Sequence, residues 1–255
     1  RTLIRWALAQ VEEPLPNCSL AAQMVLSGLV IMADWIASNT AYFPLVPADE
    51  PLRAYDPRRA AEALQKLNLP RPWQVSEAWR ETQFFPQRFG FAANSVQRQA
   101  EQIAAAMPAP GVMIIEAPMG HGKTEAALAA AEILMNRFHL GGAAFFLPSQ
   151  ATSNAMYSRM TRWAAHQPDA IRVAVELIHG QAEFNEEFRA LEEGRVLASQ
   201  GEADALTVHS LFRGRKTRLL ANLVVGTVDQ LLMAALKQKH VMLRQLGLTG
   251  KVVII

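Results

Sequence analysis

Residues 112–125, VMIIEAPMGHGKTE, carry the side chains best suited to chemistry. Gly120 and Gly122 let the backbone approach an anion closely, and the start of a helix supplies free N–H groups. Lys123 would reach the outer phosphates of a nucleotide, and the Thr124 hydroxyl would hold Mg²⁺, so these two are the candidate catalytic residues. The alternative is a chance Gly-Lys-Thr on a surface turn. The predicted binding loop consists of Ala117, Pro118, Met119, Gly120, His121, Gly122, Lys123, Thr124 and Glu125.

A phosphate loop requires a strand before it and a helix after it. The apolar residues 112–115 predict a buried parallel strand, and the alanine-rich residues 123–138 predict the helix. The same alternation continues along the chain. Further strands are predicted at 143–147, 171–177, 223–225 and 251–255, and helices at 96–107, 153–165, 183–193 and 228–238. This order predicts an α/β domain with a parallel sheet and helices on both faces.

Composition sets broad limits on the function. The chain has 255 residues, of which 51% are hydrophobic and 19% charged, as expected of a globular protein. A net charge of +2 is too small to indicate nucleic-acid binding by itself. The single Cys18 excludes an internal disulfide and favours a reducing cytoplasm.

Residues 20–36 form a nearly continuous apolar run. The run is about long enough to cross a membrane, but Gln23, Ser27 and Asp34 interrupt it and no basic flank anchors it. We therefore expect a helix buried on all sides in a helical domain, and no membrane contact. A carboxylate deep in such a helix must be paired, neutralised or bound to a metal. Asp34 is thus either a metal ligand or the partner of a neighbouring helix.

The region between the two units is a connection. Residues 41–72 contain six prolines and one predicted helix at 58–67, and residues 73–91 are rich in aromatic side chains. These rings would either dock the connection onto a core or stack on bases. The chain starts inside a helical pattern without Met and stops on an apolar strand, so we expect a piece of a longer protein.

Three sequence blocks together carry a family resemblance. APMGHGKTEAALAAA, LPSQATSNAM and VVGTVDQLLMAALKQKHVMLRQLGLTGKVVII resemble motifs I, Ia and Ib of a superfamily 2 helicase. Their amino-acid sequences are similar to those of the same motifs in the CRISPR-associated helicase-nuclease of type I systems. A fourth block, LSGLVIMADWIASNTAYFP, resembles the last helix of the HD nuclease domain of that family. The resemblance covers nearly the whole chain, although Met119, His121 and Ser149 depart from the usual residues.

The resemblance implies a domain organisation. Residues 1–75 would be the C-terminal part of an all-α HD nuclease domain, 76–92 a linker, and 93–255 the first RecA-like helicase domain. Asp34 would be a ligand of a divalent transition metal at the nuclease site. In the family an Asp-Glu pair follows the last strand, so the chain would end just before these acids.

The resemblance also implies a function. The family uses ATP and Mg²⁺ to pull single-stranded DNA from 3′ to 5′ into the nuclease, after an RNA-guided surveillance complex has opened foreign DNA. Gln97 would contact the adenine of ATP. Contacts to the DNA backbone would come from Ser149, Gln150, Thr152, Asn154, Gly226, Thr227 and Asp229.

Some assignments remain open. The basic residues Arg213, Arg215, Lys216 and Arg218 would form either an electrostatic rail for DNA or a solvated loop, and His179 would be either functional or structural. Two other functions are possible: a non-catalytic module that binds the surveillance complex, and another P-loop ATPase. A small-molecule kinase has no reason to carry the LPSQATSN and GTVDQ blocks.

Overall fold

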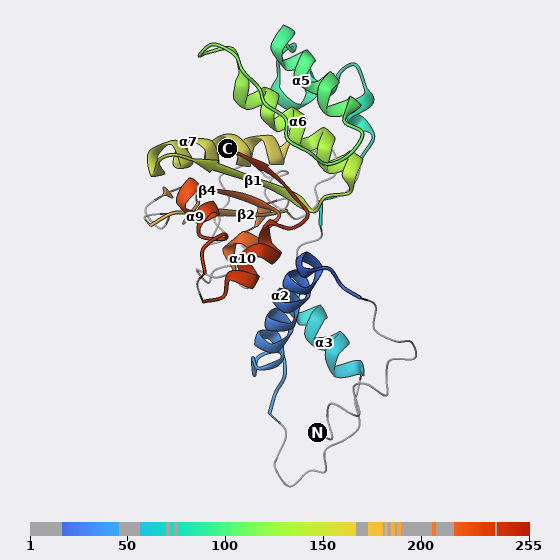
Figure 1. The fold of residues 1–255 in the computed structure, drawn as a ribbon, viewed down its shortest axis with the longest axis vertical. Helices are drawn as coiled ribbons and strands as arrows, with labels where there is room; N and C mark the ends of the chain where they lie inside the picture. Colours follow the sequence, from blue (N-terminus) through green and yellow to red (C-terminus); the bar gives the residue numbers. More distant parts are fainter. Residues whose placement is uncertain are drawn as a thin grey trace.

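The fold was analysed in a computed structural model (Figure 1). It describes residues 17–45, 57–69, 72–73, 76–166, 173–180, 182, 185–186, 188–189, 206–207, 217–237 and 239–255. The predicted fold class is confirmed: a parallel α/β domain follows a helical N-terminal part.

A parallel sheet forms the centre of the larger domain. Its strands lie in the order β3-β2-β4-β1-β5, and every described pairing is parallel. The strands are β1 (Gly142–Leu147), β2 (Val173–Ile178), β3 (Leu206–Thr207), β4 (Leu223–Thr227) and β5 (Lys251–Ile254). Leu147 lies opposite Thr227 in the register of β1 and β4. The carboxyl ends of these two strands therefore meet at one edge of the sheet.

Helices cover both faces of the sheet (Figure 1). The first face carries α6 (Lys123–Phe138) and α7 (Gln150–Ala165), and the second carries η4 (Arg218–Leu220), α9 (Val228–Leu232) and α10 (Val241–Leu248). Phe145 points into the core beneath α6 and α7, whereas its neighbour Phe146 packs with Leu219 of η4 on the second face. This alternation follows from the two-residue period of a strand. Helix α5 (Ser95–Ala106) packs against α6 on its other side.

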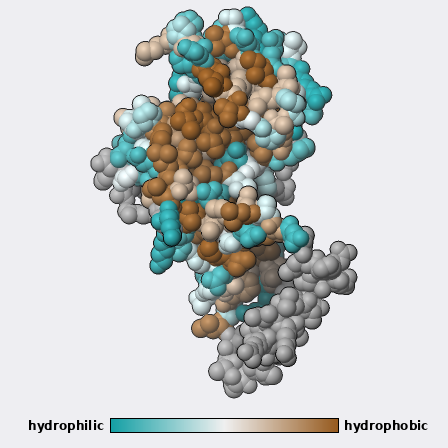
Figure 2. Space-filling model, viewed as in Figure 1, coloured by the Kyte–Doolittle hydropathy of each residue, from teal (hydrophilic) through white to brown (hydrophobic). Residues whose placement is uncertain are grey.

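The strand predicted at residues 112–115 is wrong. These residues have no regular secondary structure, and Val112 and Ile114 are 90% and 85% exposed. An apolar run favours an extended backbone, but a strand also needs a neighbour to accept its hydrogen bonds, and no described strand pairs with this run. Figure 2 shows hydrophobic atoms gathered where β5, the edge strand of the described sheet, lies.

The connection docks onto the larger domain through its aromatic residues. It contains α3 (Pro57–Leu67), as predicted, then η1 (Ala78–Arg80) and α4 (Phe84–Phe89). Phe84 and Phe85 are buried, and Trp73 stacks on Trp163 with ring centroids 5.4 Å apart. The core interpretation of these rings is therefore confirmed, although Phe91 is exposed.

A buried ion pair also fixes the connection. Arg88 of α4 donates to Glu132 of α6 at 2.8 Å, with both side chains almost completely buried. Removing either partner would leave an uncompensated buried charge, so this pair holds α4 in one position.

The apolar N-terminal run is helical, but its predicted burial is wrong. Helix α2 (Leu20–Ala37) buries only Gly28 and Met32, and Asp34 is exposed instead of lying deep in a core. Burial requires neighbours on every side, and among the described elements α2 makes its main contact with α10. In the described part of the chain α2 is the one helix long and apolar enough to cross a membrane.

Most other predicted helices and strands are confirmed within two or three residues at their ends. The helix predicted at 228–238 is too long, because α9 ends at Leu232. Tight turns follow it, in which the N–H groups of Ala234 and Ala235 donate to carbonyl oxygens three residues earlier. The helix predicted at 183–193 lies largely outside the described residues, as do residues 171–172 of the third predicted strand.

Candidate nucleotide and DNA sites

The glycine loop leads into the N-terminus of α6. Gly120 and Gly122 adopt positive φ angles of 79° and 69°, which residues with a Cβ rarely adopt. Gly122 is the N-cap and supplies no side-chain cap to the first turn. The N–H groups of that turn are therefore available to an anion, with the positive end of the helix dipole behind them.

Lys123 folds back along its own loop. Its Nζ donates to the carbonyl oxygens of Ala117 at 2.5 Å and Pro118 at 3.2 Å, and the residue is exposed. A flexible, exposed ammonium group held only by two carbonyls can turn toward an incoming phosphate. Met119 is 94% exposed, and a His121 ring nitrogen contacts the Met119 carbonyl oxygen at 3.2 Å.

An arginine from the next helix contacts this loop. Arg159 of α7 donates to Thr124 Oγ1 at 3.1 Å and to Glu125 Oε1 at 3.0 Å. The Thr124 hydroxyl, the predicted Mg²⁺ ligand, thus already has a cationic neighbour. The sequence did not indicate Arg159, because residues far apart in the chain make this contact.

Gln97 lies against the loop but has other partners. It forms a capping box with Asn94 at the start of α5, and its Nε2 donates to the Gly122 carbonyl oxygen at 3.3 Å. A Cβ at Gly122 would collide with this amide. Gln97 is therefore placed beside the glycine loop, and its contact with adenine stays a prediction.

The two predicted DNA-contacting blocks lie together at the carboxyl edge of the sheet. Ser149 follows β1 and caps α7, whereas Gly226 and Thr227 end β4. Ser153 joins the blocks by donating to the Gly226 carbonyl oxygen at 3.1 Å. A Cβ at Gly226 would lie 2.8 Å from the Ile178 carbonyl oxygen, so the residue must be small.

The predicted DNA-contacting side chains differ in accessibility. Gln150 and Asp229 are exposed, but Thr227 is buried. Ser149 and Thr152 bond one another in the capping box of α7, and such bonds would have to rearrange to contact a phosphate. Their DNA contacts stay predictions.

His179 occupies a structural position next to these blocks. It is buried, and its Nε2 lies 2.8 Å from Asn154 Oδ1, which also accepts a bond from Asn185. Burial, and secondarily the charge of Arg218, lower the pKa of His179. A neutral His179 ring that donates to Asn154 Oδ1 would hold the Asn154 amide in one orientation, and Asn154 is one of the predicted DNA contacts.

The basic cluster is described only in part. Arg213, Arg215 and Lys216 lie outside the described residues. Arg218 is described and is largely buried: its Nε lies 3.9 Å from Glu176 Oε2, and its guanidinium lies 5.9 Å from the centre of the Phe188 ring. These contacts hold Arg218 against the core, so it is not part of a solvated loop.

The described residues do not form a metal centre by themselves. No group of three or more His, Cys, Asp or Glu side chains that could hold a metal occurs within them. Asp34 on α2 is exposed, so a ligand role would require further side chains from outside the described ranges.

Two family models match this sequence. The model described as "Cas3, HD domain" matches residues 1–43, which include α2, and the model described as "DEAD/DEAH box helicase" matches residues 95–246. These matches confirm the expected succession of an HD part and a helicase part.

Curated relatives carry the same combination. The chain is 39% identical to the CRISPR-associated nuclease/helicase Cas3 of Streptococcus thermophilus over 99% of its own length and 28% of the relative's. It is 31% identical to the CRISPR-associated endonuclease/helicase Cas3 of Thermus thermophilus over 98% of its own length and 28% of the relative's. The resemblance to the CRISPR-associated helicase-nucleases is thus confirmed, and the chain spans under a third of these proteins.

Solved structures agree with this relationship. The T. fusca Cas3–AMPPNP crystal structure has a TM-score of 0.74 and 30% identity, covering 95% of this chain and 27% of that one. The T. fusca Cas3–ADP structure has a TM-score of 0.73 and 31% identity, with the same coverage.

Proposed function

The chain belongs to the DEAD/DEAH box helicase family, and from this premise we propose that it is part of an ATP-dependent translocase for single-stranded DNA. The translocase moves from 3′ to 5′ and passes the strand to a metal-dependent HD nuclease. The combined activity degrades foreign DNA in type I CRISPR interference.

One contact supports this proposal most directly. Helix α7 begins at the predicted DNA blocks with Ser149, and further along the same helix Arg159 contacts Thr124 of the glycine loop. A motor needs its nucleotide site and its DNA site to respond to one another. A helix that contacts both sites can transmit such a response.

The residues of the glycine loop fit a magnesium nucleotide. The uncapped first turn of α6 and the positive-φ glycines offer N–H groups to phosphates, Lys123 would bind the outer phosphates, and Thr124 would hold Mg²⁺. The bound ion would neutralise charge on the phosphates. Gln97, placed next to Gly122, would contact the adenine.

For the nuclease half, we assign residues 1–75 to the HD domain, 76–92 to the linker and 93–255 to the first RecA-like domain. Asp34 would contribute one ligand of a divalent transition metal. The described residues form no metal centre by themselves, so the other ligands would come from outside the described ranges.

The relatives' length supports a larger protein as the active species. The chain spans 28% of the curated Cas3 proteins, so ATP hydrolysis and strand transfer would depend on parts outside it. We expect the 255-residue chain alone to bind nucleotide weakly and to hydrolyse little. Recognition of the RNA-guided surveillance complex would likewise belong to the longer protein.

The test is ATP hydrolysis by the longer protein, measured with and without single-stranded DNA. Lys123→Ala should reduce the DNA-stimulated rate by about 100-fold or more, because the phosphates lose their mobile cation. Lys66→Ala, an exposed lysine of α3, is the matched control and should retain the wild-type rate. The absence of a DNA-stimulated rate in the wild type would favour a non-catalytic binding module, and a rate that survives Lys123→Ala would show that this loop is not the site of hydrolysis.

A further inference from the structure

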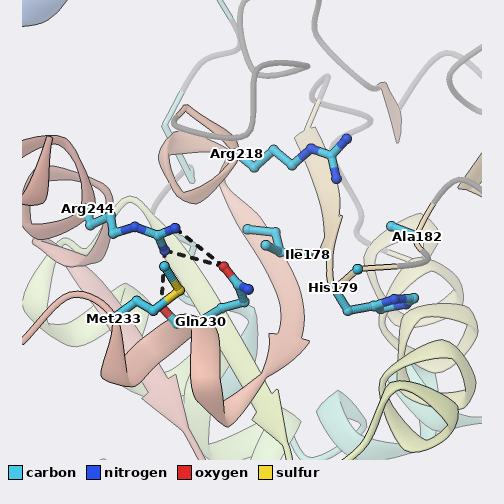
Figure 3. A pocket seen from close by; sticks show the side chains of 8 residues that line it. Ile178, His179, Ala182, Arg218, Gln230, Met233 and Arg244 are labelled. Carbon is cyan, nitrogen blue, oxygen red and sulfur yellow. Dashed lines mark hydrogen bonds between the residues drawn. The ribbon is translucent and has the colours of Figure 1, made fainter. Parts of the chain in front are cut away.

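A pocket lies beside the proposed DNA track, on the side of the sheet that α9 and α10 cover (Figure 3). Its volume is about 290 Å³, near the lower end of the range for sites that bind small organic molecules. The residues that line it come from the end of β2, the segment after it, η4, α9 and α10. Among the described residues they are Ile178, His179, Gly180, Ala182, Arg218, Gln230, Met233 and Arg244.

One arginine, Arg244, gives the pocket a positive charge that the described residues do not balance. Arg218 and Arg244 line the pocket from separate elements (Figure 3), but Arg218 is paired with the buried Glu176 at 3.9 Å. Within the described part of the chain, no carboxylate lines the pocket and Arg244 forms no ion pair. Its guanidinium donates to the backbone and side-chain oxygens of Gln230 at 3.2 and 3.4 Å, both neutral acceptors. A partly desolvated cation with neutral partners favours an anionic ligand.

Part of the described wall of the pocket is apolar. Ile178, Ala182 and Met233 contribute hydrocarbon and thioether surface. A methionine sulfur packs favourably against aromatic rings. A ligand that matches both walls therefore has a negative group at one end and a flat, weakly polar ring at the other, as a nucleotide has.

Direct contacts connect the pocket to the DNA track. His179 of the pocket bonds Asn154, and Gln230 follows Asp229. A Cβ on Gly180 would lie 3.6 Å from Gln150 Nε2. The pocket thus adjoins three of the residues predicted to contact the DNA backbone.

We propose that this pocket receives one nucleotide of the single-stranded DNA, with its phosphate at Arg244 and its base against Ile178 and Met233. The assignment rests on the proposed function, because it requires a strand on the track. A base in a single strand gives up little stacking when it turns aside, and contact with the apolar wall offsets this cost.

Fluorescence anisotropy of a labelled oligothymidylate with the longer protein, without ATP and over a range of salt concentrations, tests the phosphate contact. Arg244→Gln should weaken binding about tenfold and reduce the slope of log K against log[salt] by about 0.7, the value for one phosphate of a single strand. Arg244→Lys keeps the charge and should retain the slope. Arg162→Gln, an exposed arginine near the far end of α7, is the control and should change neither quantity.

An abasic site moved through the oligonucleotide tests the base contact. The wild type should lose affinity several-fold when the abasic site reaches one position, and Met233→Ala should show no such position. An unchanged salt slope in Arg244→Gln, or the lack of any sensitive position in the wild type, would overturn the nucleotide assignment and leave the proposed function intact. Displacement of the oligonucleotide by equal concentrations of free deoxynucleoside monophosphate would assign the pocket to free nucleotide instead. A wild-type protein that does not bind the oligonucleotide would overturn both proposals.

Discussion

Helices α2 and α6 have similar lengths and are both rich in apolar residues, yet they are buried to very different extents. Helix α6 buries nine of its 16 residues, and α2 buries two of its 18. The difference lies in their neighbours, because α6 packs between α5 and the sheet, whereas α2 packs mainly against α10. Apolar content therefore predicted both helices but not the environment of either.

The largest expected difference between the two helices is in the free energy of unfolding that is lost when one leucine in each is truncated. Leu128 of α6 is 2% exposed and Leu29 of α2 is 50% exposed. Leu128→Ala should lower the free energy of unfolding by about 2–5 kcal/mol, because it leaves a cavity under the sheet, and Leu29→Ala by less than about 1 kcal/mol. Urea unfolding measures both. Equal losses of unfolding free energy in the two variants would mean that the outer face of α2 is covered in solution.

A smaller effect is expected where α2 does have a close neighbour. A Cβ at Gly28 would lie 2.7 Å from the Met242 carbonyl oxygen and 2.8 Å from Leu246 Cβ, both in α10. Gly28→Leu should therefore separate the two helices at a cost of about 1–3 kcal/mol. Hydrogen exchange should accelerate in α2 and not in α6.

The matched control for this change is on the outer face of α2. Val30 is 68% exposed, so Val30→Leu should leave hydrogen exchange unchanged. Unchanged exchange in Gly28→Leu as well would show that the contact between α2 and α10 does not hold the helices together.

The smallest effect concerns the start of α6, which, unlike α2, is bonded to a neighbouring helix by a charged side chain. Arg159 brings a positive charge to the Thr124 hydroxyl, where Mg²⁺ would bind. Arg159→Ala should weaken magnesium-nucleotide binding by about 1 kcal/mol, roughly fivefold, because the complex carries a net negative charge and loses a nearby cation. Isothermal titration of the longer protein, with Arg162→Ala as control, measures the change. Tighter binding in Arg159→Ala would show that repulsion between the arginine and Mg²⁺ outweighs its attraction for the phosphates.

Local patterns predicted the elements of the helicase domain well. The Gly-Lys-Thr sequence marked the start of α6, and the alternation of strands and helices predicted the parallel sheet. The blocks around Ser149 and Gly226 were expected on one track, and the register of β1 with β4 does bring them together. These successes share a cause: turn chemistry and hydrophobic period act over a few residues.

Contacts between distant residues were not predictable in this way. Residues 112–115 have the composition of a strand but no described partner, and Asp34 interrupts an apolar helix whose exposed side the sequence did not indicate. Arg159 and Arg244 belong to no recognisable sequence motif. Only the fold brings Arg159 to the glycine loop and Arg244 to the pocket. Arg213 and Arg215 lie outside the described residues, so the rail they were expected to form stays a prediction.

The position of β1 between β4 and β5 also sets the order in which this domain can assemble during synthesis. Ala143 pairs with Leu223 on one side and Val252 on the other. Both edges of β1 therefore stay unpaired until these later segments have been translated. At roughly 5–20 residues per second, that delay lasts several seconds. Meanwhile Phe145 and Phe146 lack the strands that flank them in the folded sheet. A nascent chain paused after β1 is therefore a natural substrate for a chaperone.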